Sequence, residues 1–381
     1  MAPVALAFAV FDAADNPADL GVVLAANLVP HLLLLLVGGA TADRFSRRTV
    51  LVTANVGSAL TQGAVAVILL TGNYSLAFIA GLEFANGALA AFTTPALRGV
   101  VPELVTSGQL QKANALLGSA RNAIRIIGPT TAGVLVAAAG SGQAIAFDAI
   151  TFVIAAGCLL RLPASKTTRA ARIGRDIREG ASYFRSVRWL WPVSLAFFVV
   201  NLVQTGPWQI LAPQLVSQHG GPRLWGLVLS ARAVGLLVVS VVMYRLVIRH
   251  ALRVTVLGGA VAAVPLLSLG LGLPTSGLVV AAVLGGACAS ASAITWDSTL
   301  QEHIPHDKLS RVASIDDLLS YAAIPVGQLA AGPLAATIGA PTVCLASALI
   351  CIAATSAALL NRSVRDLEHG EPQANAGFER K

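Results

Sequence analysis

The sequence predicts an all-α membrane protein that crosses the bilayer many times. Of its 381 residues, 56% are hydrophobic and only 12% are charged, and the mean hydropathy is +0.75. About a quarter of the residues of a typical soluble domain are charged. Apolar runs of about 20 residues, the length that a helix needs to span a bilayer, recur along the chain. Short polar segments, many of them basic, separate these runs.

A short basic turn at residues 38–48 orients the chain. The apolar runs on either side, residues 20–42 and 50–70, are each long enough to cross the membrane, so the turn between them makes an antiparallel helical hairpin. Its three arginines place the turn in the cytoplasm by the positive-inside rule. Loops of this kind account for the net charge of +8, and we therefore expect no nucleic-acid partner.

The alternation of basic and uncharged loops predicts twelve crossings with both ends of the chain in the cytoplasm. Complete helices are expected at residues 20–42, 50–70, 76–98, 116–139, 144–160, 189–215, 224–247, 254–271, 277–300, 312–336 and 342–360. The apolar run 1–11 supplies about half of the length of a span, so the first helix is interpreted as truncated in this sequence. Residues 101–114 are expected to form a polar cytoplasmic connector.

Two six-helix bundles are the expected organisation. The N-terminal bundle covers residues 1–160, a basic cytoplasmic linker covers 161–188, the C-terminal bundle covers 189–360, and a polar, disordered tail covers 361–381. The linker contains eight Lys or Arg residues, and its part 173–183 has the pattern of an amphipathic helix on the anionic inner leaflet.

A weak internal repeat supports this division. Gly128-Pro129 and Gly140 in the first half correspond to Gly332-Pro333 and Gly339 in the second half, about two hundred residues later. Parallel repeated halves are typical of secondary transporters. The repeat therefore indicates transport as the class of function.

Several motifs resemble one family. The turn Gly39-x-x-Ala42-Asp43-Arg44-x-Ser46-Arg47-Arg48 resembles the cytoplasmic signature of the major facilitator superfamily, and Gly128-Pro129-x-x-Ala132-Gly133 looks like part of its antiporter motif. The frame that includes Pro95-Ala96, Val101-Pro102-Glu103-Leu104, Ala113-Asn114-Ala115-Leu116 and Asp148-Ala149-Ile150-Thr151-Phe152 is similar to the macrolide-efflux and siderophore-export branch of drug/proton antiporters. The resemblance covers nearly the whole chain.

This resemblance implies the major facilitator fold, with two bundles around a central cavity, and export by alternating access. It also implies a gating motif (Gly39, Asp43, Arg44, Arg47, Arg48) in which Asp43 is part of a conformational latch. Asp43 can accept hydrogen bonds from the N-terminus of an adjoining helix or pair with an arginine; the alternative is that these residues only solvate a tight turn. The chain departs from the family at Ser46, where the family has glycine, and in the second half, where the loop after residue 247 has no equivalent of Asp43.

Carboxylates inside the predicted spans are the candidates for proton coupling, because a charge at the bilayer centre costs about 2.5 to 3.5 kcal/mol even on lenient scales. Glu83 lies near the middle of the span 76–98, and Asn86, three residues on, shares its face. The alternative is a protonated, hydrogen-bonded packing residue. Asp148 and Asp297 are further candidates, closer to the interfaces, where solvation is the alternative.

Other polar residues in the spans are candidates for lining a substrate cavity. They are Arg125, Arg232, Asn86, Asn201, Gln204 and Trp208, with the alternatives that Arg232 snorkels to the interface and Trp208 belongs to an aromatic belt. Gly128, Pro129 and Gly133 are expected to kink the helix 116–139 and to allow close helix contact, or to form an ordinary packing kink.

Enzyme and metal chemistry have little support. The pair His303 and His306 is interrupted by Pro305 and lacks the four patterned ligands of structural zinc, so no metal is expected. No P-loop and no nucleophile motif occurs, and no cofactor is expected. The four cysteines lie in apolar runs and are interpreted as small core residues.

We therefore expect a monomeric multidrug exporter in a bacterial cytoplasmic membrane. It would export amphipathic molecules such as macrolides or siderophores in exchange for protons. Two alternatives stay open: a facilitator or importer of another metabolite, and a non-transporting membrane protein that is truncated or degenerate.

Overall fold

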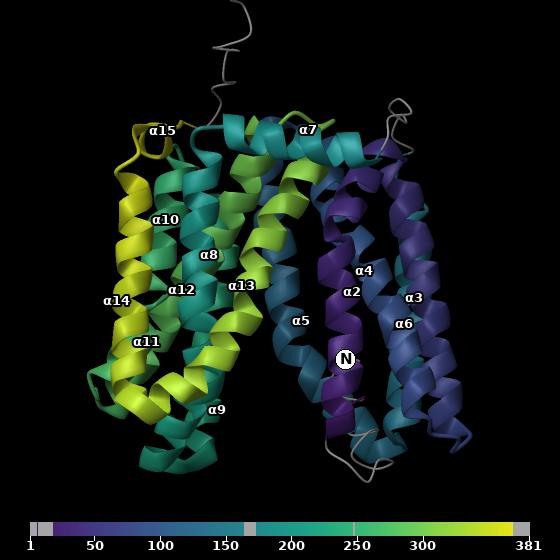
Figure 1. Ribbon diagram of the computed structural model, residues 1–381, viewed down its shortest axis with the longest axis horizontal. Helices are drawn as coiled ribbons and strands as arrows, with labels where there is room; N and C mark the ends of the chain where they lie inside the picture. The colour runs from purple at the N-terminus through teal and green to yellow at the C-terminus, as the bar shows by residue number, and fades with distance from the viewer. Residues whose placement is uncertain (1–5, 7–17, 164–172, 247, 369–381) are drawn as a thin grey trace, which may run out of the picture. The chain divides into compact units, whose positions relative to one another are not determined.

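The computed structural model describes residues 6, 18–163, 173–246 and 248–368, and within this part of the chain every regular element is a helix (Figure 1). Ten of the described helices are long and apolar enough to cross a membrane. The prediction of an all-helical polytopic protein is confirmed. The expected half-helix at residues 1–11 lies, apart from Leu6, outside the described residues.

The chain divides into two compact units. Unit 1 contains residues 1–103, 124–181 and 306–315, and unit 2 contains residues 104–123, 182–305 and 316–381. Two helices, α5 (Leu110–Ala139) and α13 (Leu309–Ile338), therefore begin in one unit and continue into the other. The bundle boundaries at residues 160 and 189 stay a prediction.

Unit 1 is built mainly on four long helices: α2 (Ala18–Arg44), α3 (Arg47–Leu70), α4 (Leu76–Leu104) and α6 (Ser141–Leu159). Figure 1 shows α3 running alongside α6, and these two helices contact each other along their lengths. Buried apolar side chains such as Val65, Ile79 and Ile145 form one core cluster, and Leu51 with Ala96 belongs to a second. The second cluster also contains Ala42 and Val50, which border the basic turn in the chain.

Unit 2 contains α8 (Leu190–Gly206), the π-helical turn η2 (Pro207–Leu211), α9 (Ala212–Arg245), α10 (Ala251–Val261), α11 (Val264–Gly270), α12 (Thr275–His303), α14 (Ala340–Leu359) and α15 (Arg362–Arg365). Here α9 packs along α12, and α14 packs against α8 and α11. The core of this unit is rich in small and aliphatic residues, among them Leu266, Cys344 and Cys351.

The structure corrects four expected boundaries. The connector 101–114 is mostly helical, because α4 continues through Pro102 to Leu104 and α5 already begins after the short 3-10 helix η1 (Ser107–Gln109). The span 254–271 is broken into α10 and α11 next to Pro265, whose ring cannot continue a helical hydrogen-bond ladder. The spans expected at 189–215 and 224–247 are found as Leu190–Val216 and Leu224–Arg245, but the segment between them is helical, since α9 includes residues of both. The tail begins with a helical turn, α15.

Two other expectations are confirmed. The amphipathic segment of the linker forms α7 (Ile173–Ser186), three residues longer than expected. The paired glycines of the internal repeat share a backbone conformation: Gly140 has φ +97° before α6, and Gly339 has φ +85° before α14. Left-handed angles of this kind favour glycine, which explains why both turns use it.

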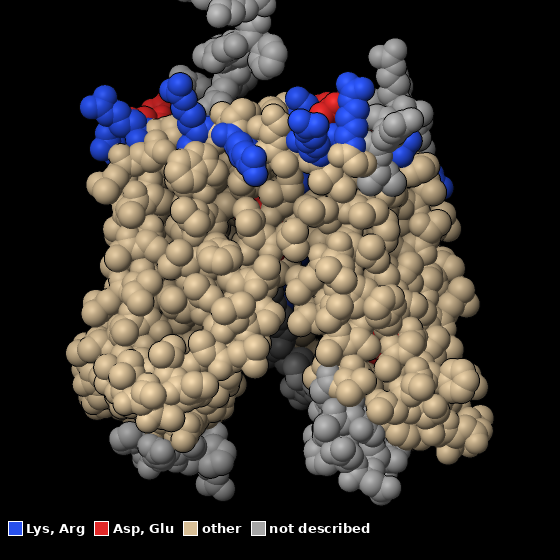
Figure 2. Space-filling model, viewed as in Figure 1, with Lys and Arg blue, Asp and Glu red and all other residues tan. Residues whose placement is uncertain are grey.

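The surface has the pattern of a protein surrounded by lipid. Large apolar side chains on the spans are exposed, for example Leu33 at 72%, Phe78 at 71% and Leu329 at 78%. Cys158 is also exposed, so it is not a core residue as expected. On the face drawn in Figure 2, the Lys and Arg residues of each unit gather at one end of that unit. This separation is what the positive-inside rule leads one to expect.

Candidate functional site

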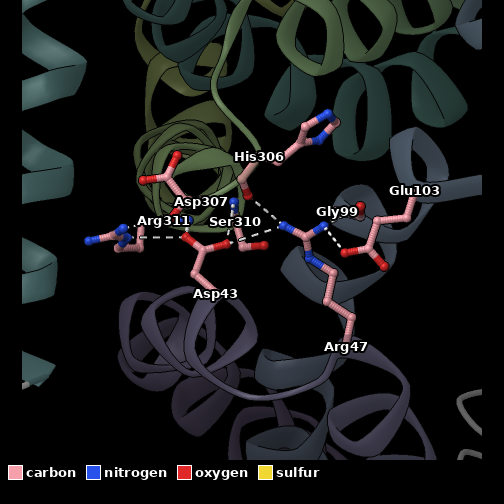
Figure 3. Close-up of polar contacts among 8 residues, drawn as sticks. All are labelled: Asp43, Arg47, Gly99, Glu103, His306, Asp307, Ser310 and Arg311. Carbon is pink, nitrogen blue, oxygen red and sulfur yellow. Dashed lines mark hydrogen bonds and ion pairs between the residues drawn. The ribbon is translucent and has the colours of Figure 1, made fainter. Parts of the chain in front are cut away.

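Asp43 holds the start of helix α13 in unit 1 (Figure 3). Its carboxylate accepts hydrogen bonds from the backbone N–H of Ser310 at 3.2 Å and of Arg311 at 3.1 Å, and from Arg311 Nε at 3.1 Å. The side chain of Asp43 is only 4% exposed. The first N–H groups of a helix have no partner within the helix and carry its positive dipole end, so a carboxylate there is favourable.

Arg47 is the second centre of this network. One Nη atom donates to the carbonyl oxygen of Gly99 at 2.7 Å and to Glu103 at 2.6 Å, and the other donates to the carbonyl oxygen of His306 at 2.6 Å. The same guanidinium lies 3.6 Å from Asp43. Figure 3 shows Asp43 between Arg311 and Arg47. Only the planar, multiply donating guanidinium can serve these acceptors together.

Small residues allow this close approach. A Cβ atom added to Gly39 would lie 2.7 Å from the carbonyl oxygen of Ser310 and would also meet the side chain of Ser314. At Gly99, an added Cβ would meet the guanidinium of Arg47. Packing against the backbone of α13 therefore favours glycine at position 39, whereas at position 99 an added Cβ would displace the guanidinium of Arg47. This close contact with α13 explains why the motif has glycine at position 39.

The network joins residues 306–315, which include the start of α13, to the rest of unit 1. Residues 306–315 belong to unit 1, whereas α13 continues into unit 2 from Asp316 onward. Arg311 adds an ion pair, with its Nη1 atom 3.6 Å from Glu179 of α7. Hydrogen bonds of a carboxylate to a helix N-terminus and to arginine are charge-assisted, and such bonds are shorter and stronger than neutral ones. Arg44 and Arg48, the other arginines of the motif, have no partner in this network.

Glu83 is the centre of a second polar cluster, buried in the middle of unit 1. The residue is 3% exposed. Its carboxylate accepts a hydrogen bond from Gln62 Nε2 at 2.8 Å and one from Asn27 Nδ2 at 2.9 Å, so α2, α3 and α4 each contribute one member. Asn86 is a further neighbour, as its spacing predicts. In the described part of the chain, no lysine or arginine forms an ion pair with Glu83.

The two other candidate carboxylates lie in different surroundings. Asp148 of α6 is buried in unit 1 and is close enough to Glu83 to affect it electrostatically. Asp297 of α12 lies in unit 2, with its carboxylate 3.6 Å from Arg121 of α5. The structure thus brings Glu83 and Asp148 into one region, while Asp297 has an arginine as counter-ion.

The cavity candidates of unit 2 are brought together in part. The guanidinium of Arg232 lies 4.9 Å from the ring centre of Trp208, and Trp208 packs on Trp225 with 5.2 Å between the ring centres. Gln204 instead donates to the carbonyl oxygen of Ala262 at 2.8 Å, which is a packing contact. Asn201 is half-buried on the same helix. A cation over an indole face is a typical element of a site that binds flat apolar molecules.

Four positions of α5 were expected to belong to the cavity or the helix-five motif, and the structure assigns none of them a contact among the described residues. The side chains of Arg125 and Pro129 lie outside the described residues. A Cβ added to Gly133 would meet no described atom within 4 Å, and one at Gly128 would meet only Ile124, in its own helix, at 3.9 Å. The close helix contact expected for these glycines is therefore not formed among the described residues.

A polar face at the start of α5 was missed by the sequence analysis. In unit 2, Asn114 donates to Gln301 at 2.6 Å, Ser119 donates to Ser240 at 2.9 Å, and Asn122 lies 3.4 Å from Ser290. The spacing of Gln111, Asn114, Ser119 and Asn122 puts them on one helical face. This periodicity is the signal in the sequence, and the expectation of a polar connector at residues 101–114 conceals it.

The loop after residue 247 has no equivalent of Asp43, and the side chain of Gln111 bonds to the backbone at this place. Its Nε2 atom donates to the carbonyl oxygens of Met243 at 3.1 Å and Leu246 at 2.6 Å, and its Oε1 atom accepts from the backbone N–H of Ile248 at 3.3 Å. In unit 1 a carboxylate from the end of α2 caps a helix N-terminus; in unit 2 an amide from the start of α5 caps a helix C-terminus.

Together, an all-helical fold with apolar spans, a buried acidic cluster and a charged network beside the basic turn are what a polytopic membrane protein of the transporter class would show. The family model described as "Transmembrane secretion effector" matches residues 1–380. The chain therefore belongs to this family of the major facilitator superfamily, and it is not an enzyme.

Relatives and solved structures agree with this assignment. The chain is 29% identical to the multidrug efflux pump Tap of Mycolicibacterium fortuitum, over 87% of this chain and 84% of the pump. It is 28% identical to Tap of Mycobacterium tuberculosis H37Rv, over 98% and 91%. Among solved structures, the human organic anion transporter MFSD10 has a TM-score of 0.73 at 16% identity, over 92% of this chain and 87% of that one. The proton:xylose symporter XylE has a TM-score of 0.70 at 14% identity, over 93% and 91%. These structures show the shared fold.

Proposed function

We propose that this transporter is a monomer in a bacterial cytoplasmic membrane that exports amphipathic small molecules in exchange for protons. Two relatives that match most of the chain are named multidrug efflux pumps, and both come from bacteria. Macrolides and siderophores are the substrate classes to test first. The sparse polar residues of the spans suit polyspecific, mainly apolar recognition.

The observation that carries the proposal of proton coupling is the surroundings of Glu83. A carboxylate in the middle of a span, held by two neutral amides and paired with no described cation, is costly to keep charged. It has partners in both protonation states. The ionised form accepts from Gln62 and Asn27. The protonated form can donate to Gln62 Oε1 once that amide turns over, because this oxygen is buried and has no hydrogen-bond partner among the described residues.

The Asp43 network supplies the conformational part of the proposal. It holds the start of α13 in one state and releases it in the other, so that the cytoplasmic side alternates between two arrangements. A proton on Glu83 and a substrate would each bias this equilibrium by binding one arrangement more tightly than the other. Only such differential binding couples proton movement to substrate movement.

The test is efflux of a lipophilic dye by everted membrane vesicles that carry the full chain. We expect Glu83→Gln to abolish dye transport driven by a proton gradient, because glutamine keeps the size of the side chain and one acceptor oxygen but cannot release a proton. The matched control is Glu368→Gln, the same change at an exposed residue of the tail. It should leave transport unchanged.

Substrate-induced quenching of the intrinsic tryptophan fluorescence separates the alternatives. Retained dye binding with lost coupling in Glu83→Gln is the expected result. Unchanged proton-driven transport in this variant would remove Glu83 from the mechanism. Dye flux that is independent of any proton gradient in the unaltered chain would establish a facilitator, and absence of both binding and flux in the unaltered chain would establish a protein that does not transport these molecules.

A further inference from the structure

An apolar groove opens on unit 1 beside the basic turn. It encloses about 370 Å³ and is walled by the C-terminal end of α2, the start of α3 and the middle of α4. The lining residues are Thr41, Phe45, Thr49, Val50, Thr53, Ala54, Leu89 and Phe92. Its volume lies in the range of about 300 to 1,000 Å³ that is typical of small-molecule sites.

The groove is apolar despite its three threonines. The hydroxyl of Thr41 donates to the carbonyl oxygen of Val37 at 2.7 Å, and that of Thr53 donates to the carbonyl oxygen of Thr49 at 2.8 Å. Hydroxyls that bond to their own helix no longer need a partner from a ligand. Phe45 is 54% exposed, so the groove is open on the side that this residue forms.

Two arginines are adjacent in the chain to residues that line this groove. Arg44 and Arg48 directly precede the lining residues Phe45 and Thr49 in the chain, and both are half-buried. The nearby acids are already engaged, since Asp43 binds Arg311 and Arg47, and Glu103 binds Arg47. Within the described part of the chain, neither Arg44 nor Arg48 forms an ion pair or a side-chain hydrogen bond.

We propose that this groove binds one anionic phospholipid of the inner leaflet. An acyl chain fills the groove among Leu89, Phe92 and Val50, and the phosphate lies at Arg44 and Arg48. The charges complement each other here, because two arginines that form no ion pair among the described residues are adjacent in the chain to the lining of an apolar groove. Basic residues near the cytoplasmic surface attract anionic lipid. The site goes beyond the transported substrate and does not depend on it.

The test uses the full chain, reconstituted into vesicles of phosphatidylglycerol and phosphatidylcholine and then extracted in detergent. Native mass spectrometry counts the phosphatidylglycerol molecules that stay bound to each protein. We expect one retained molecule for the unaltered chain, and at least tenfold lower retention for Arg44→Gln/Arg48→Gln. Thr53→Trp, which fills the groove and leaves both arginines in place, should lower retention to the same extent.

The matched control is Arg185→Gln/Arg188→Gln. Both residues are exposed and lie at the end of α7 and directly after it, so this variant loses the same charge away from the groove. It should retain phosphatidylglycerol within twofold of the unaltered chain. Equal losses in the two double variants would show diffuse attraction to basic residues and overturn the proposal. Full retention in Thr53→Trp would equally overturn it, because the lipid would then not occupy the groove. Monodisperse elution of each variant shows that it is folded.

Discussion

Replacement of Asp43 by asparagine is the sharpest test of the cytoplasmic network. The change keeps the size of the side chain and removes its charge. The carboxylate accepts three hydrogen bonds at 3.1 to 3.2 Å from Ser310 and Arg311, and it lies 3.6 Å from Arg47. An asparagine retains one acceptor oxygen, but its amide NH₂ group faces donors. Asp43→Asn therefore weakens the hold on the start of α13.

The size of the effect follows from these contacts. A hydrogen bond that involves a charged group contributes about 1.5 to 3 kcal/mol, and a charge at a helix N-terminus contributes about 1 kcal/mol. Because the asparagine oxygen preserves part of this, we expect a net loss of about 3 kcal/mol. At 1.4 kcal/mol for each factor of ten, the released arrangement becomes about 100-fold more populated relative to the held one.

The assay is alkylation of a cysteine placed at Ser310. This residue is 0% exposed, so a thiol there reacts only when the start of α13 is released. The four native cysteines at positions 158, 288, 344 and 351 are first replaced by alanine. We expect N-ethylmaleimide to label Ser310→Cys in membranes about 100-fold faster when Asp43→Asn is also present, provided that release precedes labelling as a rapid equilibrium.

Asp307→Asn is the control for this measurement. Asp307 is exposed and lies three residues before Ser310, so the control removes the same charge nearby and leaves the carboxylate of Asp43 in place. It should change the labelling rate less than twofold. A labelling rate in Asp43→Asn that matches the control would refute the inference that Asp43 holds α13.

Two further predictions concern packing and the counterpart contact. Gly39→Ala should speed labelling of Ser310→Cys, because its Cβ would lie 2.7 Å from the carbonyl oxygen of Ser310 and force α13 away; an unchanged rate would show that the turn adjusts without cost. Gln111→Leu removes three hydrogen bonds and leaves the carbonyl oxygens of Met243 and Leu246 without that donor, so we expect the protein to be destabilised by about 2 to 3 kcal/mol. Thermal unfolding followed by tryptophan fluorescence measures this loss, and Gln143→Leu, the same change at an exposed position, should not show it. Equal stability of the two variants would contradict the structural role of Gln111.

Local sequence was enough to predict the membrane class, most of the spans and the basic turn. Hydropathy and loop charge depend on composition within about 20 residues, and the bilayer converts them directly into helices and topology. The same reasoning found Glu83, because one carboxylate in an apolar run is exceptional. The polar connector expected at residues 101–114 is mostly helical, because helical periodicity and not mean polarity decides the structure of that segment.

Only the tertiary structure decided what these residues contact. Asp43 finds its partners 267 and 268 positions further along the chain, and Glu83 is held by amides 56 and 21 positions away. The identity of such partners depends on which helix faces pack together, and this is set by side-chain volumes across the whole core. The role of Gln111 shows the same limit. The missing aspartate of the second half was visible in the sequence, but its replacement by an amide on another helix follows from packing alone.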